Sequence, residues 1–170
     1  DWSTYRRSLF QHWPRFLYLV LLMTMMNFMS HGTQDMYPTL LGTLGYSKGR
    51  IANLTAISMI GAVLGGLAFG HYSDRTGRRR SIITAAVCGL VVVPFWINGF
   101  SPLLTISGVF LMQFFVQGAW GVIPAHINEL SPGALRGFFP GFAYQLGVLC
   151  ASSIPYLEAA LGERFTYRQS

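Results

Sequence analysis

The chain has 170 residues, of which 52% are hydrophobic and 11% are charged, and its formal net charge is +6. A soluble domain carries roughly 25% charged residues, so this composition argues against a water-soluble globule. It excludes intrinsic disorder, because disordered chains are poor in apolar residues. The apolar stretches lack the period-2 alternation of a membrane barrel, so we expect an all-α integral membrane protein.

Five apolar stretches approach or reach the roughly 20 residues that a helix needs to cross a bilayer. They cover residues 15–37, 51–72, 81–98, 103–125 and 138–161. A basic segment at 1–14 precedes them, and residues 162–170 are expected to form an extracytoplasmic tail. The sequence therefore predicts five transmembrane helices joined by short loops.

The basic residues are distributed as in a membrane protein rather than in a nucleic-acid-binding protein. Arg6, Arg7 and the arginine run at 78–80 each adjoin an apolar stretch, as the positive-inside rule predicts. Of the twelve Lys and Arg residues, eight fall on the side of the N-terminus: Arg6, Arg7, Arg15, Arg75, Arg78, Arg79, Arg80 and Arg136. We expect a multi-pass plasma-membrane protein (inner membrane in a bacterium) with a cytoplasmic N-terminus and no nucleic-acid partner.

The first stretch ends in a cluster of polar residues, which are expensive inside a membrane and usually functional. At 100° per residue, Asn27, Ser30, His31, Gln34 and Asp35 fall within an arc of about 140°. His31 lies one turn before Asp35, so the two side chains can meet. Such a pair suggests proton handling, because imidazole changes its charge near neutral pH. The alternative is a static hydrogen-bonded pair near the outer membrane surface.

The second stretch and the loop after it carry regularly placed glycines. Gly61, Gly65, Gly66 and Gly70 follow the small-xxx-small spacing that lets two helices approach closely. The loop itself matches the pattern G-x-x-x-D-R-x-G-R-R at every fixed position: Gly70, Asp74, Arg75, Gly77, Arg78 and Arg79. Gly77 allows a tight turn, and Asp74 can accept hydrogen bonds from an arginine.

The last two stretches contain further polar residues. Gln113 and Gln117 share one face of the fourth, and Gln145 lies early in the fifth. Prolines and glycines in the fifth stretch predict kinks, and Glu158 near its outer end is interpreted as interfacial. His71 and His126 are expected to flank loops without a partner at metal-ligand spacing: no P-loop, nucleophile elbow or metal cluster supports an enzyme, and no cofactor is implied.

The loop pattern resembles the cytoplasmic signature of the major facilitator superfamily. The stretch at 129–137 is similar to the acid…Arg-Gly segment after the fourth helix of a half in that family. The resemblance implies twelve helices in two six-helix halves, with the signature between the second and third helices of each half. It also implies gating or structural roles, without substrate contact, for Asp74, Arg75, Arg78, Glu129 and Arg136.

The first stretch resembles a more specific family motif. The pattern N-x-x-S-H-x-x-Q-D-x-x-x-T, with fixed positions Asn27, Ser30, His31, Gln34, Asp35 and Thr39, is similar to that of Jen-type monocarboxylate–proton symporters. The resemblance implies transport of lactate, pyruvate or a related acid with a proton, along a path lined by these residues and Gln145. Val148 stands where that family often has Asn. The chain would then be helices seven to eleven, five of a six-helix half, and would need a missing N-terminal half.

Two alternatives stay open. The chain could be a membrane fragment without transport of its own, such as an assembly partner, because five helices cannot form both walls of an alternating-access cavity. It could also belong to a major facilitator transporter of another organic anion or a sugar acid.

Overall fold

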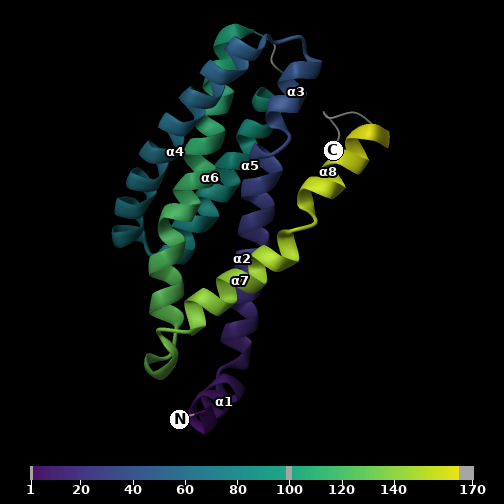
Figure 1. The fold of residues 1–170 in the computed structure, drawn as a ribbon. Helices are drawn as coiled ribbons and strands as arrows, with labels where there is room; N and C mark the ends of the chain where they lie inside the picture. Colours follow the sequence, from purple (N-terminus) through teal and green to yellow (C-terminus); the bar gives the residue numbers. More distant parts are fainter. Residues whose placement is uncertain (1, 99–100, 165–170) are drawn as a thin grey trace.

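The computed structural model describes residues 2–98 and 101–164, and every regular element in these ranges is a helix (Figure 1). The predicted all-α fold class is therefore confirmed. The elements are α1 (Trp2–Gln11), α2 (Trp13–Gln34), α3 (Tyr37–Thr43), α4 (Lys48–Thr76), α5 (Arg78–Asn98), α6 (Pro102–Leu130), the 3-10 helix η1 (Gly133–Leu135), α7 (Phe139–Ala151) and α8 (Ile154–Arg164).

Four segments within the described residues are long and apolar enough to cross a membrane: Trp13–Thr43, Lys48–Thr76, Arg78–Asn98 and Pro102–Leu130. They overlap the first four predicted stretches. The first segment is bent, because α2 ends at Gln34 and α3 begins at Tyr37 with Pro38 in its first turn. Proline is tolerated there, because the first turn of a helix needs no backbone donor at that position.

The fifth predicted stretch is not one helix. It is divided into α7, with 13 residues, and α8, with 11 residues, while a membrane span over 138–161 stays a prediction. Pro155 follows the first residue of α8, and a proline disfavours helical geometry in the residue before it. The kinks expected from the sequence are thus realised as a break. Of the predicted tail, residues 162–164 belong to α8 and 165–170 lie outside the described residues.

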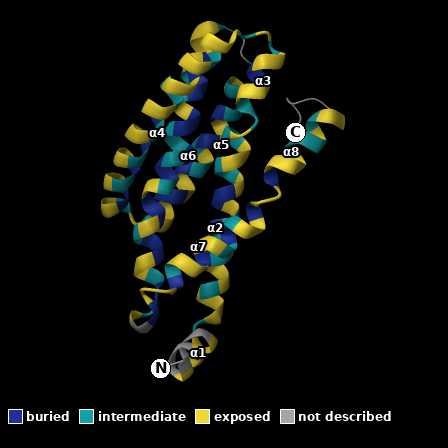
Figure 2. Ribbon diagram, viewed as in Figure 1, coloured by how far each residue is buried: buried dark blue, intermediate teal, exposed yellow. Residues whose placement is uncertain are grey.

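Helix α6 is the centre of the bundle. It packs along both α4 and α5, and α7 lies across α2 (Figure 1). A core of buried apolar side chains joins these helices, and it includes Met23, Ala119, Val122 and Phe139. The outer faces carry exposed apolar residues such as Leu67 and Leu90, as expected for helices in contact with lipid (Figure 2).

Glycines account for the close contact between α4 and α6. A Cβ added at Gly61 or Gly65 would overlap the carbonyl groups of Phe110 or Phe114 on α6. The predicted small-residue packing is therefore confirmed for this part of α4. The same expectation is wrong for Gly70, because a Cβ there would meet nothing within 4 Å.

Candidate functional site

The first cluster of charged side chains lies where α4 meets α5, and it begins with the turn that joins them. Gly77 has φ 92° and ψ 147°, a backbone conformation that side-chain-bearing residues rarely adopt. Ser81, which is fully buried, donates to the Gly77 carbonyl at 3.1 Å and bonds to the Thr76 hydroxyl at 2.9 Å. These contacts fix the turn and place Arg78 at the start of α5.

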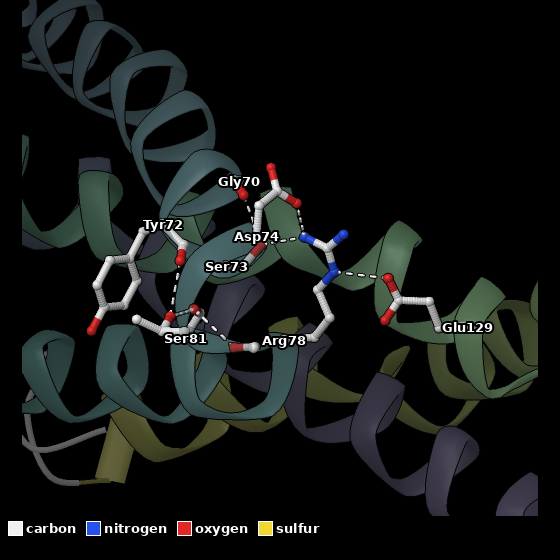
Figure 3. A network of polar contacts seen from close by, with 9 residues as sticks. Gly70, Tyr72, Ser73, Asp74, Arg78, Ser81 and Glu129 are labelled. Atoms are coloured by element: carbon white, nitrogen blue, oxygen red, sulfur yellow. Dashed lines mark hydrogen bonds and ion pairs between the residues drawn. The ribbon is translucent and has the colours of Figure 1, made fainter.

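Arg78 connects three helices through its guanidinium group (Figure 3). One terminal nitrogen donates to Asp74 at 2.5 Å and to the Ser73 hydroxyl at 2.6 Å, both on α4. The Nε atom donates to Glu129 Oε1 on α6 at 3.0 Å. We call Ser73, Asp74, Arg78 and Glu129 the Arg78 junction. A guanidinium suits this role, because it has five donors in a fixed fork and stays charged at any physiological pH.

Three other basic residues of the predicted signature stand apart from this junction. Arg75, Arg79 and Arg136 are exposed, and no ion pair joins any of them to another residue of the described ranges. The two acids of the junction are themselves more than half exposed, with side-chain values of 59% for Asp74 and 55% for Glu129. The junction is therefore a contact that water can reach and that a rearrangement of the helices can break.

The second cluster lies at the end of α2. His31 Nδ1 is 3.1 Å from Asp35 Oδ2, so the contact expected from their spacing is present. The two side chains are 46% and 32% exposed. Gln34 donates to the Ser30 hydroxyl at 3.0 Å on the same part of the helix. The pair stands directly before the bend between α2 and α3, where its polar groups are open to an approaching solute.

The remaining residues of the predicted motif are more scattered. Asn27 is only 3% exposed and donates to the Met23 carbonyl of its own helix at 2.8 Å. Thr39 is exposed on α3. Gln145 is also exposed: it lies on the side of α7 opposite the buried Ala143 and Gly147, and Gly147 contacts α2. The structure thus brings Ser30, His31, Gln34 and Asp35 together but directs Gln145 away from them.

Glu158 on α8, which the sequence predicts to be interfacial, lies against α2 in the structure. Its Oε1 lies 3.4 Å from the position that a Cβ would take on Gly32, so the carboxyl group rests against α2 beside His31. Its Oε2 is buried and has no hydrogen-bond partner. A signal was available: Glu158 is the only acid in the stretch 138–161, and an ionisable residue within a membrane segment is a functional candidate.

His126 also differs from its prediction. It does not flank a loop, because α6 continues to Leu130 and the residue is only 8% exposed. Its Nε2 lies 3.2 Å from the hydroxyl of Tyr18 on α2. This contact connects α2 with α6 in the same half of the bundle as the Arg78 junction.

Comparison with known proteins gives a match over most of the chain. Residues 17–163 match the sugar (and other) transporter family. The chain belongs to this family. A carboxylic acid transporter protein homolog of Saccharomyces cerevisiae is 33% identical over 163 residues, which cover 94% of this chain and 26% of that protein.

Other transporters match shorter parts of the chain. The facilitated glucose transporter member 3 of Mus musculus is 32% identical over 99 residues, which cover 55% of this chain and 20% of that protein. A "Probable 4-methylmuconolactone transporter" of Cupriavidus pinatubonensis is 30% identical over 111 residues, covering 65% of this chain and 25% of that protein. The chain thus spans about a quarter or less of the length of these relatives. No solved structure matches it.

The matching family and the names of these relatives are those of membrane transport proteins. One cavity next to the end of α2 is lined in part by polar side chains. It is lined by Gln34 and Thr33 of α2 and by Gln113 of α6, whose buried Oε1 has no partner. Its volume of about 50 Å³ is far below the roughly 300–1,000 Å³ of ordinary ligand pockets. This cavity is therefore smaller than an ordinary ligand pocket.

Proposed function

We propose that the chain forms part of the C-terminal half of a secondary transporter that carries a small monocarboxylate, such as lactate or pyruvate, together with a proton. Membership of a transporter family supports transport, and the yeast relative named as a carboxylic acid transporter homolog supports the class of substrate. The observation that carries the proposal is the contact of His31 with Asp35 at 3.1 Å in a partly exposed position.

The chemistry of the pair suits the joint binding of an anion and a proton. A protonated His31 attracts a carboxylate, and the proton cancels the charge of the anion before the loaded site crosses the membrane. We assign Asn27, Ser30, Gln34 and Thr39 to the same path. Gln145, which is directed away from α2, is assigned to the surface that faces the missing N-terminal half.

The Arg78 junction is proposed to hold the cytoplasmic ends of the helices together in one state of the alternating-access cycle. The distribution of Lys and Arg supports an orientation in which the N-terminus and the α4–α5 turn face the cytoplasm. We place the protein in the plasma membrane. In this scheme Asp74, Arg78 and Glu129 form the contact, Gly77 shapes the turn, and the exposed Arg75, Arg79 and Arg136 face the inner surface of the membrane.

The test is uptake of labelled lactate by the full-length carrier that contains this chain. We expect uptake to collapse in His31→Ala and in Asp35→Asn, because either change removes one partner of the pair. His71→Ala is the matched control, since His71 is exposed on α4 and far along the chain from the pair. Undiminished, still proton-coupled uptake in both variants would contradict the proposal.

The second candidate function is transport of another organic anion or a sugar acid. Relatives that match parts of the chain are named as transporters of glucose and of 4-methylmuconolactone. Competition of labelled lactate uptake by a panel of short acids, sugar acids and sugars separates the two. Inhibition by sugar acids or sugars, and not by short monocarboxylates, would favour the second candidate.

A third possibility follows from the share of the yeast relative that the chain covers, which is 26%. On this alternative, the chain does not transport by itself and is a membrane fragment or an assembly partner. Co-expression with an N-terminal half, read by uptake, distinguishes a transport-incompetent fragment from half of a working carrier.

A further inference from the structure

The carboxyl group of Glu158 is held in an unusual position for an acid near the end of a membrane segment. Helix α8 packs against α2, and a Cβ added at Gly32 would lie in van der Waals contact with Glu158 Oε1, at 3.4 Å. The other oxygen, Oε2, is buried without a hydrogen-bond partner. Burying a charged oxygen that has no partner is expensive.

The charged groups around Glu158 come from α2, the helix that α8 packs against. His31 and Asp35 both lie within electrostatic reach of its carboxyl group. On α8 itself, Glu163 and Arg164 are exposed beyond it. Asp35 repels a second negative charge, whereas a protonated His31 attracts one. The charge of Glu158 therefore depends on whether the neighbouring histidine carries a proton.

We propose that Glu158 completes a proton-binding site with His31 and Asp35, which we call the Glu158 cluster. This inference deepens the proposed function and rests on it for its role in transport. While His31 is neutral, Glu158 keeps its proton, because an ionised carboxylate would stand unpaired beside Asp35. No hydrogen bond joins Glu158 to His31 in the structure, so the side chain of Glu158 must first turn toward the imidazole. The O–H bond of the carboxyl group then breaks, its electron pair stays on oxygen, and a new N–H bond forms on His31.

The proton transfer has a direct consequence for substrate binding. It creates an imidazolium group at the exposed end of α2, where a substrate carboxylate can approach. It also leaves the Glu158 carboxylate close to the new positive charge, so the total charge of the cluster does not change. The cluster thus stores the proton on a group turned toward the interior and moves it to a group that a solute can reach.

Infrared spectroscopy on the purified chain in lipid nanodiscs tests the location of the proton without any transport assay. Near neutral pH, we expect a C=O stretching band of a protonated carboxyl group that disappears in Glu158→Gln. Glu163→Gln, on the same helix but exposed, should keep the band, and Glu158→Asp, which retains a carboxyl group, should keep it at a shifted frequency. A band that is absent from the unaltered chain, or unchanged in Glu158→Gln, would overturn the proposal.

Transport by the full-length carrier tests the use of that proton. In Glu158→Gln, we expect loss of the lactate accumulation driven by a pH gradient, while exchange of labelled for unlabelled lactate continues. Glu163→Gln should retain both. Accumulation equal to that of the unaltered carrier would overturn the role of Glu158 in coupling, and so would loss of exchange together with accumulation.

The two failures can be told apart. If the unaltered carrier takes up no monocarboxylate with a proton, the proposed function is wrong, and the infrared result still decides whether Glu158 holds a proton. If the His31 and Asp35 variants lose coupling and Glu158→Gln does not, the proposed function stands and the inference about Glu158 is wrong.

Discussion

The Arg78 junction and the Glu158 cluster, at opposite ends of the bundle, contain the same numbers of ionisable groups, two acids and one base, but satisfy them differently (Figure 1). At the junction one guanidinium contacts both acids. At the cluster one imidazole contacts Asp35, and a buried oxygen of Glu158 has no partner. The difference lies in the base: arginine has a permanent charge and five donors, whereas histidine has two ring nitrogens and a charge that depends on pH. One end is therefore suited to holding helices together, and the other to binding and releasing a proton.

The largest expected effect comes from removing the base at the junction. Arg78→Gln leaves Asp74 and Glu129 without their shared guanidinium, so that two negative groups remain near the ends of α4 and α6. We expect lactate uptake by the full-length carrier to be lost and the melting temperature of the detergent-solubilised protein to fall. Arg80→Gln, an exposed arginine two residues further along the same helix, is the control. A melting temperature that falls equally in both variants would argue against a specific role for the junction.

A smaller effect is expected when the base of the junction is made titratable. Arg78→His places a histidine at the Arg78 junction, which is the kind of base found in the Glu158 cluster. Two neighbouring acids raise the pKa of an introduced imidazole in the folded state above its unfolded value of about 6.5. The added stability is therefore fully present below the unfolded pKa and is lost as the pH rises through the folded pKa. Melting temperatures measured across this range should fall with rising pH in the variant relative to the unaltered protein. A constant difference at all pH values would show that charge at this position does not control the contact.

The smallest effect on stability is expected at the Glu158 cluster. In Gly32→Leu, a branched side chain occupies the space next to Glu158 Oε1 and displaces the carboxyl group from α2. Unfolding free energy should change by no more than about 1 kcal/mol, because Gly32 is exposed and leucine favours the helix. Accumulation of lactate under a pH gradient should nevertheless fall. Gly42→Leu on α3, where a Cβ would meet nothing within 4 Å, is the control. Equal accumulation in both variants would mean that the approach of α8 to α2 is not needed.

Local spacing accounts for the features that the sequence predicted well. Residues four apart on a helix meet, so the contact of His31 with Asp35 follows from the period of the helix. The glycine spacing at 61 and 65 likewise predicted the close packing against α6.

Features that depend on the arrangement of distant segments were harder to predict. The contact between Arg78 and Glu129 joins residues 51 positions apart, and only the family resemblance placed both at the same end. The contact of Glu158 with α2 was not predicted, because the position of α8 depends on the break between α7 and α8. Gly70 was assigned to helix packing because its spacing continues that of Gly65 and Gly66, but a Cβ at Gly70 would meet nothing within 4 Å.

The break between α7 and α8 has a consequence for how the chain enters a membrane during biosynthesis. With a rise of 1.5 Å per residue, α7 is about 20 Å long and α8 about 17 Å, whereas the hydrocarbon core is about 30 Å thick. Neither helix alone reaches across that thickness, so if the fifth predicted stretch spans the membrane, the two helices and the joint at residues 152–153 must enter it together. At this joint the Leu149 carbonyl accepts both the backbone N–H of Ser152, at 3.3 Å, and its hydroxyl, at 2.8 Å, so the polar groups of Ser152 find partners within the chain. A chain cut between the two helices would leave two segments that are each shorter than the hydrocarbon core is thick.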